Sequence, residues 1–324
     1  RSSASPVDRM SDVIRARGLT KVYPRGGREL PPALAGVDLD IPEGRTYGLI
    51  GRNGAGKTTF VRICATQLAP TSGTLTILGE DAVQNVGAVR TRIACVPQES
   101  RPLYFVKVFE LISLYLRVRG MDRTEAVRRT REVLKELDLT PVANRLVNHL
   151  SGGMRRRAMV AMVLASDAEV LYLDEPTTGL DPVARRDVWG AIRRAERAGR
   201  TVLLTTHYLD EAEALSARLA LLEGGKVLLE GRPDDLRARV RQPYRVTVQG
   251  QFTASELQSY GTVGAVEGGF LVFAAEPAAR ELALAALTRG ARVSMGPVSL
   301  EDLFLQIVGK RLDEDSDATE EALA

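Results

Sequence analysis

Residues 51–59 combine the residue types and the spacing that phosphate binding requires. They are Gly51, Arg52, Asn53, Gly54, Ala55, Gly56, Lys57, Thr58 and Thr59, and they fit the phosphate-binding loop pattern G-x-x-x-x-G-K-[ST]. Glycines let the backbone curl so that several N–H groups point at one phosphate chain. The lysine adds a positive charge for the β- and γ-phosphates, and the hydroxyl of Thr58 suits Mg²⁺. The stretch therefore predicts a nucleotide site.

The segments on either side of this loop are of the kind that would position it. Residues 46–50 predict a strand that enters the loop, and residues 57–68 predict a helix that leaves it. The N-terminus of such a helix contributes its dipole to an anion site. Residues 170–174 are apolar on both faces, as expected of a central parallel strand.

Composition and charge limit the class of protein. The chain has 324 residues, is 44% hydrophobic and carries a net charge of +3. These values favour two domains, or one large domain with an appendage, and do not by themselves argue for nucleic acid. Cys64 and Cys95 lie in apolar surroundings, which favours two reduced core thiols over a disulfide, and no cluster has zinc spacing. No apolar run approaches the roughly 18 residues of a membrane span, so we expect a soluble, cytoplasmic chain.

The order of the predicted elements divides the chain. Residues 1–12 predict a disordered leader, and residues 13–235 predict an α/β domain. Its other strands are expected at 13–23, 33–41, 73–78, 93–96 and 201–205, with a closing hairpin of 218–222 and 227–229 and helices over 183–198 and 208–217. A helical insertion is expected over 101–166, with helices at 106–116, 123–137 and 141–146.

Beyond residue 235 the sequence predicts a separate unit. Residues 240–311 follow a strand-helix-strand-strand-helix-strand order, which predicts a small α+β domain. We expect Thr253 to cap its first helix and Ser299 to cap a last helix that runs to Lys310. Residues 312–324 are acidic and predict a disordered tail.

Further motifs follow the phosphate loop in a set order. They are Tyr23 upstream, Gln98 after a strand, Leu-Ser-Gly-Gly-Met at 150–154, Val-Leu-Tyr-Leu-Asp-Glu-Pro at 170–176, Gly-Leu-Asp-Pro at 179–182, and His207. This set resembles the ATP-binding cassette of ABC transporters, over about residues 13–235. The resemblance implies a P-loop ATPase domain with a mixed sheet, an N-terminal antiparallel β subdomain and the helical insertion. It also implies hydrolysis of ATP with Mg²⁺.

The resemblance gives roles to individual residues. Asp174 and Gln98 would join Thr58 at Mg²⁺, and Glu175 would polarise the attacking water. Gln98 would also relay nucleotide occupancy to the helical insertion. His207 would hydrogen-bond the γ-phosphate, although a histidine taken alone is more often structural. Tyr23 matches the aromatic residue that stacks on adenine, although an aromatic residue after a strand usually belongs to the core.

A second anion site is implied at the start of another helix. Ser151, Gly152 and Gly153 combine a helix dipole, free N–H groups and a hydroxyl. In the family this site completes the γ-phosphate pocket of the opposite protomer, and Asp181 lies across the same seam. One set of motifs in each chain therefore implies a dimer with two composite sites. The family often has Gln where this chain has Met154, a side chain that the N–H cradle does not need.

Two stretches indicate the branch of the family and its partners. Residues 205–213 and 299–305 resemble the drug-resistance (daunorubicin-type) type-2 exporter ATPases. The resemblance implies a dimer on the cytoplasmic face of the plasma membrane that powers export of a small molecule through separately encoded membrane subunits. We expect a homodimer, with a heterodimer as the open alternative. Candidates for the groove that receives the membrane subunit follow Gln98, with ordinary packing an equal alternative: Tyr104, Phe105, Phe109 and Glu110.

The alternative function is a soluble ABC-type ATPase that acts on nucleic acid or on protein assembly. Arginines are frequent between Arg117 and Arg157, but no aromatic residues interleave them as a single-strand binder requires, and a solvated helix surface is favoured. The chain has one cassette, and its insertion is too short for a long coiled coil. We therefore expect no nucleic-acid partner.

Overall fold

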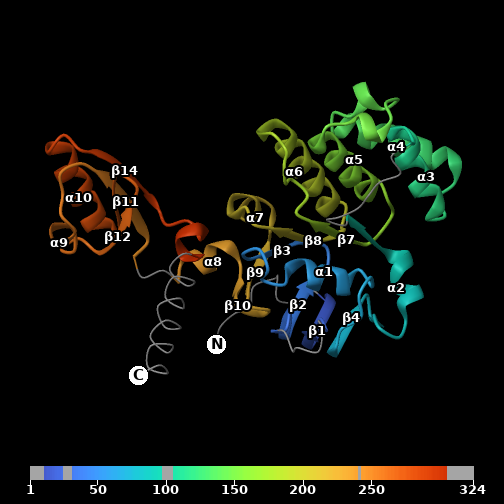
Figure 1. Cartoon of the computed structure of the whole chain (residues 1–324), viewed down its shortest axis with the longest axis horizontal. Coiled ribbons are helices and arrows are strands. Elements are labelled where there is room, and N and C mark those ends of the chain that lie inside the picture. Colours follow the sequence, from blue (N-terminus) through green and yellow to red (C-terminus); the bar gives the residue numbers. More distant parts are fainter. Residues whose placement is uncertain (1–10, 25–30, 97–104, 240–241, 305–324) are drawn as a thin grey trace. The chain divides into compact units, whose positions relative to one another are not determined.

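The computed structural model describes residues 11–24, 31–96, 105–239 and 242–304 (Figure 1). The chain forms two compact units, residues 1–230 and 231–324. No helix in these described ranges is both long enough and apolar enough to cross a bilayer.

The first unit is built on a six-stranded sheet with the order β10-β9-β3-β8-β7-β6 (Figure 1). Its strands are β3 (Thr46–Ile50), β6 (Ile93–Val96), β7 (Val170–Asp174), β8 (Thr201–Thr206), β9 (Arg218–Glu223) and β10 (Lys226–Gly231). β3 pairs in parallel with β8 and β9, and β7 pairs in parallel with β6 and β8. Parallel neighbours end at the same edge of a sheet, so the segments that follow β3, β8 and β7 meet there.

An antiparallel sheet forms a second layer and confirms the predicted N-terminal β subdomain. Its order is β2-β1-β4-β5, and its strands are β1 (Asp12–Lys21), β2 (Leu34–Pro42), β4 (Ser72–Ile77) and β5 (Glu80–Asp81). The pairings of β1 with β2 and β4, and of β4 with β5, are all antiparallel.

The helices of this unit lie on both sides of the six-stranded sheet (Figure 1). They are α1 (Lys57–Cys64), α2 (Val86–Arg92), α3 (Val108–Val118), α4 (Arg123–Glu136), α5 (Gly152–Leu164), α6 (Pro182–Arg197) and α7 (Leu209–Leu215). α3, α4 and α5 pack together as the predicted helical insertion.

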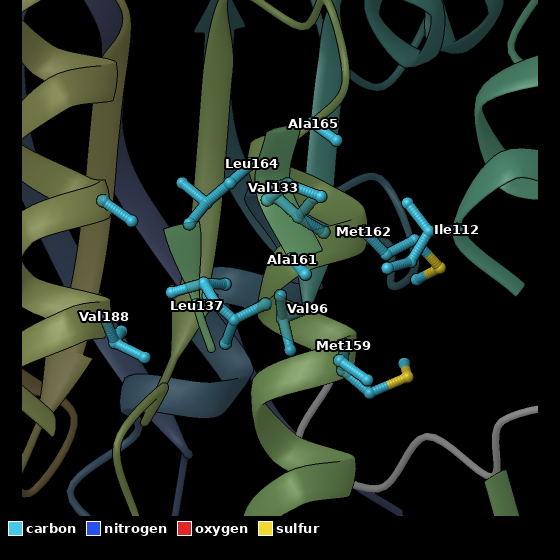
Figure 2. Packing of buried hydrophobic residues seen from close by; sticks show 14 of the residues in the cluster. Val96, Ile112, Val133, Leu137, Met159, Ala161, Met162, Leu164, Ala165 and Val188 are labelled. Carbon is cyan, nitrogen blue, oxygen red and sulfur yellow. The ribbon is translucent and has the colours of Figure 1, made fainter. Parts of the chain in front are cut away.

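The central sheet separates two hydrophobic cores, and β7 contributes to both. Side chains alternate along a strand, so Leu171 and Leu173 pack with the helical insertion whereas Val170 and Tyr172 pack with α1 and the antiparallel sheet. Figure 2 shows the insertion side, where Met159 and Met162 of α5 and Ile112 of α3 belong to one buried cluster. Because β7 is packed on both faces, its position is fixed, and so is that of Asp174 at its end.

The second unit is a small α+β sandwich with the predicted order of elements. Its sheet runs β12-β13-β11-β14 with antiparallel pairing throughout. Its elements are α8 (Pro233–Arg237), β11 (Tyr244–Gln249), α9 (Ala254–Leu257), β12 (Thr262–Val266), β13 (Gly269–Ala274), α10 (Glu276–Thr288) and β14 (Arg292–Pro297). The buried side of α10 packs on the sheet. Thr253 caps α9 as predicted, and Ser299 Oγ accepts from the N–H of Asp302, 3.2 Å away, at the start of the last helix. The predicted course of that helix beyond residue 304 lies outside the described residues, as do residues 1–10 and the tail.

Two of the predicted helices are wrong in detail. The predicted helix over 141–146 is replaced by two 3₁₀ turns, η2 (Thr140–Val142) and η3 (Val147–His149). The intervening backbone pairs instead with the segment before α3: Val108 N donates to Arg145 O and Val147 N donates to Val106 O. The helix that follows the phosphate loop ends at Cys64 rather than residue 68, because Thr66 adopts a left-handed conformation with φ 56°. The sequence reading also missed α2 and α8.

Tyr172 provides a test of the core on the α1 side of the sheet. Its side chain is fully buried, and among the described residues no group lies within hydrogen-bond distance of its hydroxyl. Burial also raises the pKa of this phenol well above its usual value. Because an unsatisfied buried hydroxyl is unfavourable, we expect Tyr172→Phe to raise the free energy of unfolding by about 1 kcal/mol in urea denaturation.

The neighbouring Leu171→Ala is the comparison, because it leaves a cavity on the other face and should lower the free energy of unfolding by about 3 kcal/mol. A loss of stability in Tyr172→Phe would contradict this description of the core.

Candidate active site

A cavity of about 420 Å³ opens where the phosphate loop meets the ends of β7 and β8. Its walls bring together residues from distant parts of the sequence: Ala33, Asn53, Gly54, Gly56, Lys57, Thr58, Thr59, Glu175, Thr178 and His207. The sheet order explains the meeting, because β8 lies between β3 and β7. Most of the site residues that we expected to act within a single chain therefore line this cavity or lie next to it.

The backbone of the phosphate loop requires glycine at two positions. Gly56 has φ 107°, and a Cβ atom there would lie 2.4 Å from the carbonyl oxygen of Ala33. A Cβ atom on Gly51 would lie 2.2 Å from the carbonyl oxygen of Leu222. Ala55 is buried, and its N–H donates to the carbonyl of Arg52 across the turn, at 3.2 Å. A loop packed this tightly against its own protein leaves its open side for a phosphate chain.

Lys57 places a cation at the inner wall of the cavity. Its side chain is 5% exposed, and Nζ donates to the carbonyl oxygens of Gly51 at 2.7 Å and Arg52 at 3.1 Å. Nζ also lies 3.9 Å from Oε1 of Glu175. Burial lowers the pKa of this ammonium, an effect that the nearby Glu175 and Asp174 carboxylates oppose. A phosphate chain would supply further negative charge to this cation.

Asp174 ends β7 beside the phosphate loop. Its side chain is almost fully buried, and Oδ1 accepts a hydrogen bond from the hydroxyl of Thr205 on β8. Burial raises the pKa of the carboxyl, while hydrogen bonds with the Thr205 and Thr58 side chains act in the opposite direction. Thr58 and Asp174 thus offer hydroxyl and carboxylate oxygens side by side, the donor type that Mg²⁺ prefers. No group of three or more His, Cys, Asp or Glu able to hold a metal occurs within the described residues.

Glu175 is held in an uncommon backbone conformation. Its φ is 51°, in the left-handed region, and its N–H donates to both O and Oγ1 of Thr205, at 3.0 and 3.1 Å. The side chain then reaches the cavity, where Oε1 lies 3.3 Å from Nδ1 of His207 and Oε2 accepts from Thr178 Oγ1 at 3.1 Å. A left-handed conformation at a non-glycine residue is a form of local strain that clusters at functional sites.

Tyr23 and Gln98 differ in how far the structure places them. Tyr23 is 37% exposed, and its hydroxyl lies 3.4 Å from Oγ1 of Thr59. It therefore lies beside the phosphate loop and outside the core, where a base could stack on it. Gln98 and Tyr104 lie outside the described residues.

The second predicted anion site lies away from the cavity. Ser151 caps α5, accepting from Met154 N at 3.2 Å, and both Ser151 and Gly152 are exposed. Asp181 caps α6 in the same way, and hydrogen bonds from the N–H groups of Ala184 and Val183 lower its pKa. The two caps adjoin through Gly153, where a Cβ atom would lie 3.2 Å from the carbonyl oxygen of Gly179. None of these residues lines the cavity of their own chain.

Sequence reasoning missed a buried carboxylate beneath the site. Glu211, on α7, is fully buried, and Oε1 accepts from Thr177 Oγ1 at 2.8 Å and from Trp189 Nε1 at 2.9 Å. Thr177 follows Glu175 by two residues, so Glu211 braces the segment behind the cavity. Its burial raises its pKa. The only sequence signal was its place inside the stretch that follows His207.

Comparison with known proteins identifies the class. Residues 34–178 match a family described as ABC transporter. The chain is 35% identical to the daunorubicin/doxorubicin resistance ATP-binding protein DrrA of Streptomyces peucetius, over 95% of this chain and 96% of that protein. It is 34% identical to the Nod factor export ATP-binding protein I of Cupriavidus metallidurans, over 94% of this chain and 99% of that protein. The chain belongs to the ABC transporter ATP-binding family.

A solved structure agrees with the family and with its chemistry. The dimeric post-hydrolysis state of the ATP-binding cassette MJ0796 bound to ADP and Pi matches with a TM-score of 0.62 and 27% identity, over 68% of this chain and 98% of that one. Family and structure together confirm the predicted fold class and the predicted activity. The chain is an ABC ATPase that binds and hydrolyses ATP.

The buried carboxylate of this ABC ATPase can be tested through the only tryptophan of the chain, Trp189. Glu211→Ala leaves the Thr177 hydroxyl and the indole N–H buried without their acceptor, so the free energy of unfolding should fall by about 2–3 kcal/mol. Glu211→Gln keeps an acceptor oxygen and should lose less. Trp189 fluorescence during urea unfolding measures both effects.

The neighbouring Asp210 provides the control for this measurement. Its side chain is 65% exposed and pairs with Arg185 at 3.6 Å, so Asp210→Ala should change the free energy of unfolding by about 0.5 kcal/mol or less. Equal losses in Glu211→Ala and Asp210→Ala would contradict the bracing role.

Proposed function

We propose that this ABC ATPase is the energy-supplying subunit of an exporter, and that the predicted site residues carry out its hydrolysis. The observation that carries the proposal is the meeting of Lys57, Glu175 and His207 at one cavity, with Asp174 next to Glu175 at the end of β7. These are the groups that bind a triphosphate, hold a metal ion and handle the attacking water. ATP is the substrate.

The proposed mechanism assigns one task to each group. Lys57 and the N–H groups of the phosphate loop bind the β- and γ-phosphates. Thr58 and Asp174, with Gln98, would hold Mg²⁺, which would neutralise charge on the phosphates. Glu175 Oε1 lies 3.9 Å from Lys57 Nζ and 3.3 Å from His207 Nδ1, so a γ-phosphate bound by Lys57 would lie beside this carboxylate. Glu175 then orients the attacking water and accepts its proton, and His207 donates to the γ-phosphate.

A second protomer completes the proposed site. Ser151, Gly152 and Asp181 are exposed and Gly153 is half-buried, and none of the four lines the cavity of its own chain. A helix N-terminus with a hydroxyl and free N–H groups binds anions, and the related MJ0796 cassette is dimeric with ADP and Pi. We therefore infer a homodimer in which these residues contact the γ-phosphate bound by the partner, while Tyr23 stacks on the adenine in its own chain.

The proposed membrane partner would contact the helical insertion. Of the four candidate residues, Tyr104 lies outside the described residues, Phe109 packs against the insertion core, and Glu110 accepts from Lys107 N at 3.1 Å. Phe105 is 85% exposed. Aromatic side chains are enriched at protein interfaces, and we propose Phe105 as the part of the groove that receives a separately encoded membrane subunit.

The proposed cargo is a small molecule, because the relatives compared above are named for resistance to daunorubicin and doxorubicin and for export of Nod factor. The proposed location is the cytoplasmic face of the plasma membrane.

The alternative of a nucleic-acid-directed ATPase gains no support from the arginines of the insertion. Arg128 and Arg129 pair with Glu125, Arg119 donates to the Ile93 carbonyl, and Arg157 donates to the Leu137 carbonyl. Side chains used in this way do not form a free basic surface.

Glu175→Gln tests the proposed hydrolysis. The change keeps the shape of the side chain but removes the group that accepts the proton, so turnover should fall by roughly 10²–10⁴-fold while ATP binding persists. Phosphate release and equilibrium nucleotide binding measure the two properties. Glu132→Gln, at an exposed position on α4, is the matched control and should leave both unchanged.

The same variant tests the export role. In membrane vesicles that hold the chain with its membrane subunits, ATP-driven uptake of daunorubicin, as the probe, should be lost in Glu175→Gln. Turnover near that of the unmodified chain in Glu175→Gln would exclude Glu175 as the base. An unmodified chain that hydrolyses ATP but binds no integral membrane protein would exclude the exporter role.

A mixture of two inactive variants tests the composite site. Lys57→Ala should lose nucleotide binding, whereas Ser151→Arg should retain ATP binding in the monomer and block dimer closure. In a heterodimer of the two, both defects fall in one site and the second site keeps a native lysine and a native serine. The mixture should therefore regain hydrolysis that neither homodimer shows, measured as phosphate release against mixing ratio. Full activity of the Ser151→Arg homodimer would contradict the arrangement across two chains.

A further inference from the structure

Arg156 links the helix that begins at Ser151 to the residues at the cavity. It lies on α5, one turn after the cap, and its Nη2 donates to the carbonyl oxygens of both Asp174 and Glu175, at 2.8 Å for Glu175. One guanidinium nitrogen carries two N–H groups, so it can donate one to each carbonyl. The two residues it holds are the proposed metal ligand and the proposed base.

The contact is unusual because it places a charged group where burial opposes charge. Burial lowers the pKa of Arg156, and the carboxylates of Asp174 and Glu175 oppose that effect. The adjacent arginines make different contacts: Arg155 donates to the Leu150 carbonyl at 3.3 Å and Arg157 to the Leu137 carbonyl at 3.1 Å. Arg156 therefore contacts the backbone of the two residues at the cavity, whereas these bonds of Arg155 and Arg157 lie elsewhere.

The backbone of Glu175 depends on support from two sides. Its left-handed φ of 51° is unfavourable for a side chain with a Cβ atom. Thr205 holds the N–H side through its carbonyl and its hydroxyl, at 3.0 and 3.1 Å. Arg156 holds the carbonyl side at 2.8 Å. The direction in which the carboxylate leaves the backbone follows from this conformation, so releasing either side would let the carboxylate move away from the attacking water.

We propose that Arg156 is a positioning residue, which fixes the backbone of Glu175 from the helix that carries Ser151. The proposal rests on the proposed function of Glu175. Arg156 does not line the cavity, so it acts on hydrolysis through Glu175 and not by contact with ATP. Arg156 thereby connects two parts of the proposed dimer's sites. One is α5, whose start would contact the partner's nucleotide, and the other is Glu175, the base for the nucleotide of its own chain.

Arg156→Met tests the proposal, because methionine keeps an unbranched apolar stem and removes every donor. We expect kcat to fall about 10- to 100-fold, while KM and the affinity for ATP stay within about 2-fold. Arg156→Lys retains a charged donor but not the planar guanidinium, so it should recover part of the lost activity and not all of it. A role in folding alone would lower the yield or stability of the protein without this division between kcat and KM.

Arg200 provides a matched control. It is also half-buried, burial lowers its pKa to about 10, and it donates to the backbone carbonyls of Leu164 and Ala168 at 2.7 and 2.9 Å. These contacts lie outside the site. Arg200→Met should therefore reduce stability while the folded protein keeps its kcat. An equal loss of kcat in Arg200→Met and Arg156→Met would overturn the proposal.

The double variant Arg156→Met with Glu175→Gln separates failure of this inference from failure of the proposed function. If Arg156 acts through Glu175, the double variant is as slow as Glu175→Gln alone, since residues that act as a unit are not additive. A further fall overturns the positioning role and leaves the function of Glu175 intact. Near-normal turnover of Glu175→Gln overturns the proposed function itself. Should Arg156→Met not fold, Arg156→Lys decides: a lower kcat with unchanged ATP affinity supports the proposal, and an unchanged kcat overturns it.

Discussion

The ABC ATPase gathers one cation and two carboxylates at the end of its central sheet, in positions that water reaches poorly. Lys57, Asp174 and Glu175 are all buried. Removing charges from water is unfavourable unless hydrogen bonds and opposite charges replace the lost hydration. Here the ammonium donates to loop carbonyls, Asp174 accepts from Thr205, and Glu175 accepts from Thr178. These contacts do not fully replace hydration, because burial still lowers the pKa of Lys57 and raises that of Asp174. A bound triphosphate with its metal ion would supply the missing opposite charges.

This arrangement requires that strand ends stay in position to within a fraction of an ångström. The two hydrophobic cores supply that rigidity, because β7 packs Leu171 and Leu173 into one core and Val170 and Tyr172 into the other. Neither face of the strand is free to move without opening a close-packed interior. Thr205 of β8 links this strand to the end of β7, since it contacts both Asp174 and Glu175.

The sequence was most informative where the chemistry depends on neighbours along the chain. The phosphate loop, the apolar strand that ends at Asp174, and the caps at Ser151 and Thr253 are local patterns, so each could be read from a few residues, and the order of elements gave the fold class. The contacts of Arg156 and Glu211 could not be read, because their partners lie 18 to 34 residues away and are mainly backbone carbonyls or side chains of other elements. The helix predicted over residues 141–146 was wrong for the same reason. The backbone there pairs with the segment before α3, and helical periodicity carries no information about that pairing.

The position of the proposed second anion site supports the proposed dimer. A helix start leaves N–H groups without partners inside the helix, and at α5 the side chain of Ser151 accepts from only one of them, that of Met154. The site is exposed, it adjoins the cap at Asp181 through Gly153 and Gly179, and it takes no part in the cavity of its own chain. The N–H groups at the start of α5 are thus available to an anion that comes from outside the chain. The γ-phosphate bound by a partner fits that requirement, because it would bring to the start of α5 the charge that the helix dipole favours.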